Sequence, residues 1–149
     1  YGYFFVLNSA SGYIGVQVIA KVSQRIQLKW VVVGIFACQI VFGVGLVLAA
    51  LLEANLFVVQ ATIMLLVFFI GGSFAPLGTL ALTRHGEEAG TAAALNMVLG
   101  SIGTTLAAPL FAQLGSSNTL GLGLMEITVF TLALIGMFTI VNVRKMPNL

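Results

Sequence analysis

The stretch KWVVVGIFACQIVFGVGLVLAALLE, residues 29–53, decides the fold of this chain. Lysine and glutamate stand at its two ends, and the run between them, 30–52, carries no charged side chain. A helix needs about 20 apolar residues to cross the hydrocarbon core of a bilayer, which is about 30 Å thick. The run is continuous and lacks the alternation of polar and apolar residues that is typical of a membrane barrel strand. It therefore predicts a transmembrane helix.

The composition of the whole chain agrees with this interpretation. Of the 149 residues, 60% are hydrophobic and 7% are charged, and aspartate is absent. Soluble domains are about a quarter charged, so these residues cannot build a water-soluble surface. We expect an integral membrane protein with the lipid bilayer as a partner. The chain starts at Tyr1 rather than Met and enters an apolar run without a signal peptide, so we expect it to be cut from a longer protein.

The charged residues divide the chain into five apolar runs. The longest, 89–125, is too long for one crossing, and its segment QLGSSNTLGLG (113–123) gathers residues that favour turns. We therefore predict an all-α fold, a polytopic bundle of transmembrane helices that forms one carboxyl-terminal, partial transmembrane domain over 1–149. The predicted spans lie near 3–20, 30–52, 56–80, 91–112 and 121–143.

All six basic residues fall on one side of such a bundle. Five crossings place three segments together: KVSQRIQLK (21–29), LTRHGEEAG (82–90) and the tail RKMPNL (144–149). By the positive-inside rule this side is cytoplasmic. We expect a multi-pass protein of the inner membrane with a cytoplasmic carboxyl end, and the placement of the charges argues against nucleic acid as a partner. The basic residues are Lys21, Arg25, Lys29, Arg84, Arg144 and Lys145.

The segment RHGEEAG (84–90) concentrates charge in a chain that has little. Arg84 and His85 would end the third helix, and Glu87 and Glu88 would begin the fourth. Cations near a helix C-terminus and anions near an N-terminus each stabilise it by about 0.3–1 kcal/mol. We interpret the segment as a charged cap of a helical hairpin and a topology signal. A gating contact that forms and breaks is the alternative.

Small and polar residues recur on one face of the first and of the fourth predicted helix. Small residues let helix backbones approach closely in lipid. For each residue taken singly, ordinary packing is the favoured interpretation, whereas each seam as a whole could be a contact that slides or gates. The seams are Asn8, Ser11 and Gly15 in the first helix and Asn96, Gly100 and Thr104 in the fourth.

The third predicted helix brings different side chains to one face. At 100° per residue, Gln60, Met64 and Phe74 point in similar directions. An amide, a thioether and an aromatic ring together suit adaptable apolar ligands, so these residues are candidates for the wall of a substrate cavity. Plain packing is the more common role of such a stripe. Pro76 predicts a kink in this helix.

Glu126 is the one carboxylate that falls within a predicted span. An ionisable group inside a membrane is a functional candidate, here for a proton relay. Alternatively, the fifth helix begins near Glu126 and the carboxylate reaches headgroups or water, and the preceding Gly121 and Gly123 favour this second interpretation. Cys38 is interpreted as a packing residue. One histidine, one cysteine and no aspartate leave neither a metal cluster nor an acid–base pair in the spans, so we expect no enzyme, cofactor or metal.

Three stretches resemble the carboxyl-terminal part of major facilitator superfamily transporters, most closely the Bcr/CflA-type drug-resistance efflux proteins. FFVLNSASGYIGVQVIAKVSQRIQLK (4–29) is similar to the eighth helix of that family and the basic loop after it. APLGTLAL (75–82) is similar to the end of the tenth helix. GEEAGTAAALNMVLGSIGTTLAAPL (86–110) is similar to the next loop and the eleventh helix, and its Gly-Glu-x-Ala-Gly-x-Ala-x-Ala-Leu pattern is the most specific of the three.

This resemblance implies that the five spans correspond to helices eight to twelve of the family and that the amino-terminal half of the transporter is a missing partner. In that family the eighth and eleventh helices line the contact between the halves, and the tenth faces the central cavity. The implied function is proton-coupled efflux of drugs or small amphipathic metabolites by alternating access, with protons and a small-molecule substrate as partners. Metabolite uptake by another branch of the superfamily and a non-transporting scaffold subunit remain alternatives.

Overall fold

The computed structural model describes residues 2–82 and 119–139 without gaps. Within 90–113 it describes positions 90–91, 93–95, 97–98, 100–102, 105, 109 and 113. All of these residues are helical except for two short turns, so the prediction of an all-α chain is confirmed over the described part. A short apolar helix, Ala93–Ile102, is recorded within the predicted fourth span. The long helices are α1 (Gly2–Ser23), α2 (Leu28–Leu51), α3 (Leu56–Leu82) and α5 (Thr119–Thr139).

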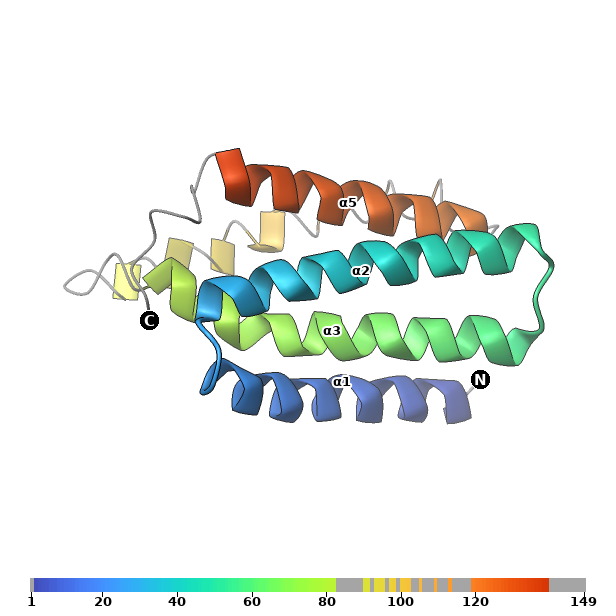
Figure 1. The fold of residues 1–149 in the computed structure, drawn as a ribbon, viewed down its shortest axis with the longest axis horizontal. Helices are drawn as coiled ribbons and strands as arrows, with labels where there is room; N and C mark the ends of the chain where they lie inside the picture. Colours follow the sequence, from blue (N-terminus) through green and yellow to red (C-terminus); the bar gives the residue numbers. More distant parts are fainter. Residues whose placement is uncertain are drawn as a thin grey trace.

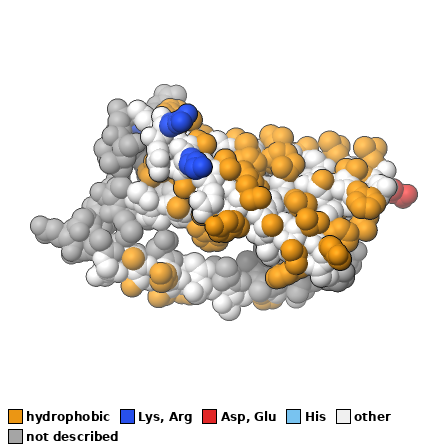
Figure 2. All heavy atoms as spheres, turned by 90° about the horizontal axis from the view of Figure 1, so that it is seen from below, with side chains coloured by type: hydrophobic (Ala, Val, Ile, Leu, Met, Phe, Trp, Pro, Cys, Tyr) orange, Lys and Arg blue, Asp and Glu red, His pale blue; other side chains and the backbone are white. Residues whose placement is uncertain are grey.

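These four helices are each long and apolar enough to cross a membrane. Large apolar side chains cover their outer faces, as Figure 2 shows for one side of the bundle. Soluble proteins rarely expose apolar surface on this scale, whereas contact with lipid requires it. The chain is therefore a multi-pass membrane protein.

The long helices lie side by side in one layer, in the order α1, α3, α2, α5 (Figure 1). The helices α1, α3 and α5 run in the same direction, and α2 runs opposite to them. The order in the layer differs from the order in the chain, because α1 packs on α3 and α2 packs on α5. Each pair thus joins helices that do not follow one another directly.

Glycines mediate both of these contacts. A Cβ atom built on Gly15 of α1 would fall on the carbonyl oxygen of Phe68 in α3. A Cβ atom on Gly71 of α3 would lie 2.6 Å from the carbonyl oxygen of Gly12. In the other pair, a Cβ atom on Gly123 of α5 would lie 3.0 Å from a carbonyl oxygen of α2. Small residues at these positions let the backbones meet, which is how helices associate tightly in lipid.

The interior of the layer is built mainly on α2. Most of the buried side chains belong to this helix, because α3 covers one of its sides and α5 the other. Phe36 of α2 packs against Phe130 of α5 with ring centroids 5.5 Å apart, and Phe42 stacks on Phe69 of α3 at 5.7 Å. Tilted and offset ring pairs at such distances are favourable. Aromatic contacts therefore pack both sides of α2, and on the α5 side they supplement the glycine contact.

The turn between α2 and α3 is fixed by backbone and side-chain hydrogen bonds. Glu53 has a positive φ of 47°, and the N–H of Ala54 donates to the carbonyl oxygen of Ala49 at 2.9 Å. This arrangement is the Schellman motif, which caps a helix C-terminus and usually has glycine in the left-handed position. Asn55 then caps α3, since its Oδ1 accepts a hydrogen bond from the N–H of Phe57 at 3.4 Å.

Charge separates the two ends of the layer. Lys21, Arg25 and Lys29 lie where α1 ends and α2 begins, and these are the only cations among the described residues. Glu53 lies at the opposite end, and Figure 2 shows basic and acidic side chains at opposite ends of the molecule. Two of the predicted cytoplasmic cations, Lys21 and Arg25, are exposed, whereas Lys29 is buried with 8% of its surface exposed. The described charges are thus distributed along the direction in which the helices run.

Candidate functional site

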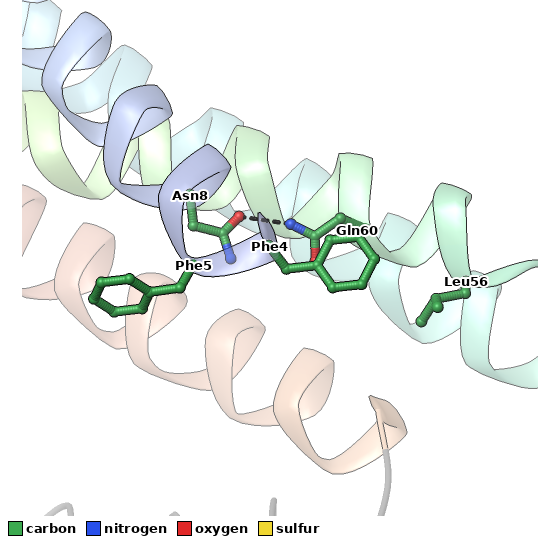
Figure 3. A pocket seen from close by; sticks show the side chains of 5 residues that line it. All are labelled: Phe4, Phe5, Asn8, Leu56 and Gln60. Carbon is green, nitrogen blue, oxygen red and sulfur yellow. Dashed lines mark hydrogen bonds between the residues drawn. The ribbon is translucent and has the colours of Figure 1, made fainter. Parts of the chain in front are cut away.

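Two amide side chains meet between α1 and α3. Gln60 Nε2 donates a hydrogen bond to Asn8 Oδ1 at 2.9 Å (Figure 3). One turn further along, Ser11 Oγ donates to the carbonyl oxygen of Met64 at 2.7 Å. Both bonds lie within the first three turns of the two helices, and those turns are at the end of the layer away from the end of α1 that carries the cations. In lipid, a hydrogen bond between side chains of two helices stabilises their association by about 0.6 kcal/mol on average. Because hydrogen bonds are directional, the two bonds also fix how α1 and α3 face each other.

A pocket of about 480 Å³ opens beside this amide pair. Its size falls within the range of small-molecule sites, and its lining combines apolar side chains with a few polar groups, as such sites do. Figure 3 shows that α1 and α3 both contribute to it. Its lining residues are Phe4, Phe5, Asn8, Leu56 and Gln60.

The amide pair keeps hydrogen-bonding capacity on the pocket side. An amide carries two donors and an oxygen with two lone pairs. The bond between Asn8 and Gln60 uses one donor of Gln60 and one lone pair of Asn8, which leaves Asn8 Nδ2 and Gln60 Oε1 for other partners. Both residues are half-buried, and both line the pocket. The site can therefore bind a molecule with an apolar body and both an acceptor and a donor.

The residues predicted to form one cavity wall lie at separate places. Gln60 lines the pocket just described, whereas Phe74 is 72% exposed and lines a second pocket of about 370 Å³. Fourteen residues separate them, which is about 21 Å along a helix. Met64 lies between them and is half-buried against α1. The second pocket also contacts Met97 and Gly100 from the range of the fourth predicted helix.

The seam predicted on the first helix contacts α3. Asn8, Ser11 and Gly15 all meet residues of that helix. A Cβ atom built on Gly100, in the seam predicted on the fourth helix, would have no neighbour within 4 Å. The remaining predicted site residues lie outside the described part of the chain: Asn96, Thr104, Arg84, Glu87 and Glu88.

Glu126 lies well inside a helix. The structure begins α5 at Thr119, so the interpretation that this helix starts near Glu126 is wrong. The reason is that Gly123 serves as a close contact with α2 rather than as a helix breaker. Glu126 Oε1 is buried and lines a third pocket of about 170 Å³.

Sequence reasoning missed Gln39, which is fully buried in α2. Its Nε2 donates to the carbonyl oxygen of Leu66 in α3 at 3.2 Å. The available signal was its position as the single amide within the apolar run 30–52. A buried amide in such a run needs a partner on another helix.

Comparisons with known proteins give no relative: no family model, no curated protein and no solved structure matches the chain. Among the described residues, no three of the His, Cys, Asp and Glu side chains come together as metal ligands. The features of the described residues that bear on function are therefore the pockets and the polar contacts between helices.

Proposed function

We propose that the chain is part of a secondary active transporter that exports drugs or small amphipathic metabolites in exchange for protons by alternating access. The single observation that carries this proposal is the pocket beside the Asn8–Gln60 pair. It joins hydrogen-bonding amides to phenylalanine rings in a protein whose described residues form four helices long and apolar enough to cross a membrane. The resemblance of the sequence to Bcr/CflA-type efflux proteins of the major facilitator superfamily points to the same function.

The chemistry of the lining defines the substrate class. Phe4, Phe5 and Leu56 offer apolar surface, and the two amides offer one or two hydrogen bonds. None of the described residues that line this pocket carries a charge. A substrate with a flat or bulky apolar body and a polar group matches this lining, because binding energy then comes from buried area and orientation from the amides.

The glycine contacts support motion of the described helices as one body. Gly15 fixes α1 on α3 and Gly123 fixes α5 on α2, with backbone carbonyl groups in close contact. Packed helices of this kind have little freedom to slide, and alternating access by rocking requires rigid halves. We therefore assign the moving contact to the apolar face of α1 that points away from α3, where Tyr13 is 67% exposed. The partner across that contact would be the amino-terminal half of the transporter.

The distribution of charge supports an orientation. Lys21 and Arg25 would face the cytoplasm of an inner-membrane protein, and the carboxyl end would lie on the same side. The pocket of the amide pair, at the other end of the layer, would then belong to the outward half of the transport route.

Transport assays on the complete protein test the proposal. Proteoliposomes with an imposed pH gradient should accumulate ethidium or rhodamine 6G, and Gln60→Ala should raise the KM for the dye about tenfold, as loss of about 1.4 kcal/mol of binding does. Thr62→Ala is the matched control, since the Thr62 hydroxyl bonds the Val58 carbonyl of its own helix and lies outside the pocket.

Three results would count against the proposal. Equal KM values for the Gln60→Ala and Thr62→Ala proteins would remove the pocket from the substrate route. Absence of gradient-driven flux for every dye in a folded, reconstituted wild-type protein would refute export. Flux that runs with the proton gradient instead of against it would replace export with uptake.

A further inference from the structure

Two side-chain oxygens in the described interior are buried without a hydrogen-bond partner: Gln39 Oε1 and Glu126 Oε1. Buried polar atoms are nearly always hydrogen-bonded, so each exception requires a physical reason. The free-energy cost of burial differs between the two atoms. Burying an ionised carboxylate among apolar side chains costs far more than burying an amide oxygen without a partner.

Both oxygens belong to the contact between α2, α3 and α5. A Cβ atom built on Gly43 of α2 would lie 3.5 Å from Glu126 Cβ, so the glutamate is packed directly on α2. Gln39 lies four residues earlier on the same helix, or about 6 Å along its axis. Leu66 of α3, whose carbonyl oxygen accepts the Gln39 amide, also lines the pocket around Glu126.

The described residues around Glu126 supply no counter-charge in its pocket. Its volume is about 170 Å³, and apart from Glu126 its described lining is entirely aliphatic. No titratable or charged side chain from α2, α3 or α5 faces the carboxyl group among the described residues that line this pocket. The aliphatic lining consists of Leu46, Ile63, Leu66, Val67, Ile70 and Leu122.

The lining also decides which ion the site can hold. Calcium takes six to eight oxygen ligands and magnesium an octahedron of them, whereas the described lining offers one carboxyl group. A proton needs no further ligand. It neutralises the carboxyl group in place, and the resulting O–H is a donor in a region where Gln39 Oε1 is an acceptor without a partner.

We propose that Glu126 is a proton-binding site: its carboxyl group is protonated while the pocket between α2, α3 and α5 is closed, and it releases the proton when the pocket opens to water. The binding of the proton stands on the geometry alone. Its use as the coupling ion rests on the proposed transport function. The site places a proton carrier in this part of the transporter, in addition to any carboxylates of the missing half.

Chemical labelling tests proton binding without transport. Dicyclohexylcarbodiimide is apolar and reacts with protonated carboxyl groups, whose O–H adds across a C=N bond to give an acylisourea that rearranges to a stable N-acylurea. In the complete protein in liposomes at pH 7, mass spectrometry should find this adduct on Glu126. Glu53, exposed in the turn after α2, should be labelled at least about tenfold less by this reagent, because the apolar reagent partitions into the bilayer.

Two variants define the outcome. Glu126→Gln should abolish the adduct, and Glu53→Gln should leave it unchanged. The proposal fails if Glu126 in the folded wild-type protein is labelled no more than Glu53. It also fails if a water-soluble carbodiimide labels both glutamates equally, since the pocket would then be open to water.

Coupling is tested separately in the dye assay. Glu126→Gln should lose dye accumulation driven by the pH gradient, whereas Glu53→Gln should retain it. Gradient-driven accumulation by a folded Glu126→Gln protein would overturn the coupling role and leave the labelling result standing. Labelling of Glu126 in a wild-type protein that transports no dye would sink the transport proposal instead, so the two failures are distinguishable.

Discussion

A single methyl group at Gly15 would meet the carbonyl oxygen of Phe68. Backbone atoms cannot rotate away as a side chain can, so α1 and α3 would have to separate. We expect Gly15→Ala to lower the free energy of unfolding by about 1–3 kcal/mol, which is the usual cost of overpacking. Denaturation by sodium dodecyl sulfate in mixed micelles, followed by circular dichroism, measures this change.

Gly34 provides the control for that substitution. It lies in the interior of α2, and a Cβ atom there would have no neighbour within 4 Å. Gly34→Ala should stabilise the protein by up to about 1 kcal/mol through helix propensity alone. If both substitutions were neutral, the close contact of α1 with α3 would not exist in the membrane.

The candidate site could be predicted from the sequence only in part. Periodicity placed Asn8 and Gln60 each on a face of its own helix, but it could not show that the two faces meet. Those residues were assigned to different roles, a seam and a cavity wall, because pairing between helices is a tertiary property. The burial of Glu126 depended in the same way on Gly123, whose role as a contact is visible only once α2 lies beside it.

At the scale of the elements, the turn between α2 and α3 places a charged residue where glycine is usual. Glu53 adopts the left-handed conformation, which costs a residue with a side chain roughly 1–2 kcal/mol. Glu53→Gly should therefore raise the free energy of unfolding by about 1 kcal/mol, offset in part by the greater flexibility of the unfolded chain. The same detergent titration measures the shift.

Glu53→Gln separates conformation from charge at this turn. Glutamine keeps the side chain and its backbone strain, so its stability should match that of the wild type. A gain in stability for glutamine equal to that for glycine would show that the charge, rather than the φ angle, is the cost.

The positions of the helices in the sequence were easier to predict than the pairs in which the helices pack. Continuous apolar runs bounded by charge identified α2 and α3, since length and composition alone determine whether a helix can span a membrane. Pro76 lies inside α3, which continues past it to Leu82, and its side chain is fully buried. A proline within a membrane helix is tolerated where neighbouring helices cover it.

For the whole molecule, the order α1, α3, α2, α5 was not predictable from the sequence. In a soluble protein the apolar stripe of a helix shows which face is buried. Here the faces towards lipid and towards other helices are both apolar, and only small residues and amides distinguish them. The contact of α1 with α3, rather than with its neighbour in the chain α2, could not be predicted from the periodicity of apolar residues alone.

The winding of the bundle predicts opposite exposure for its two described turns. In a protein with Cys38→Ala, a membrane-impermeant maleimide should label Leu52→Cys in intact cells and Arg25→Cys only after the membrane is permeabilised. Both positions are exposed, so access to the reagent depends on the side of the membrane. Labelling of both positions from the same side would contradict the conclusion that α2, which lies between them, crosses the membrane.

The contact between α1 and α3 can form only after both helices have been synthesised and inserted into the membrane. Asn8 and Gln60 are 52 residues apart, and ribosomes add about 5–20 residues per second, so roughly three to ten seconds pass between their syntheses. During that interval a newly inserted α1 holds Asn8 and Ser11 beside lipid or the insertion machinery, with its partner still unmade. These polar groups of α1 gain their hydrogen-bond partners only when α3 is inserted beside it.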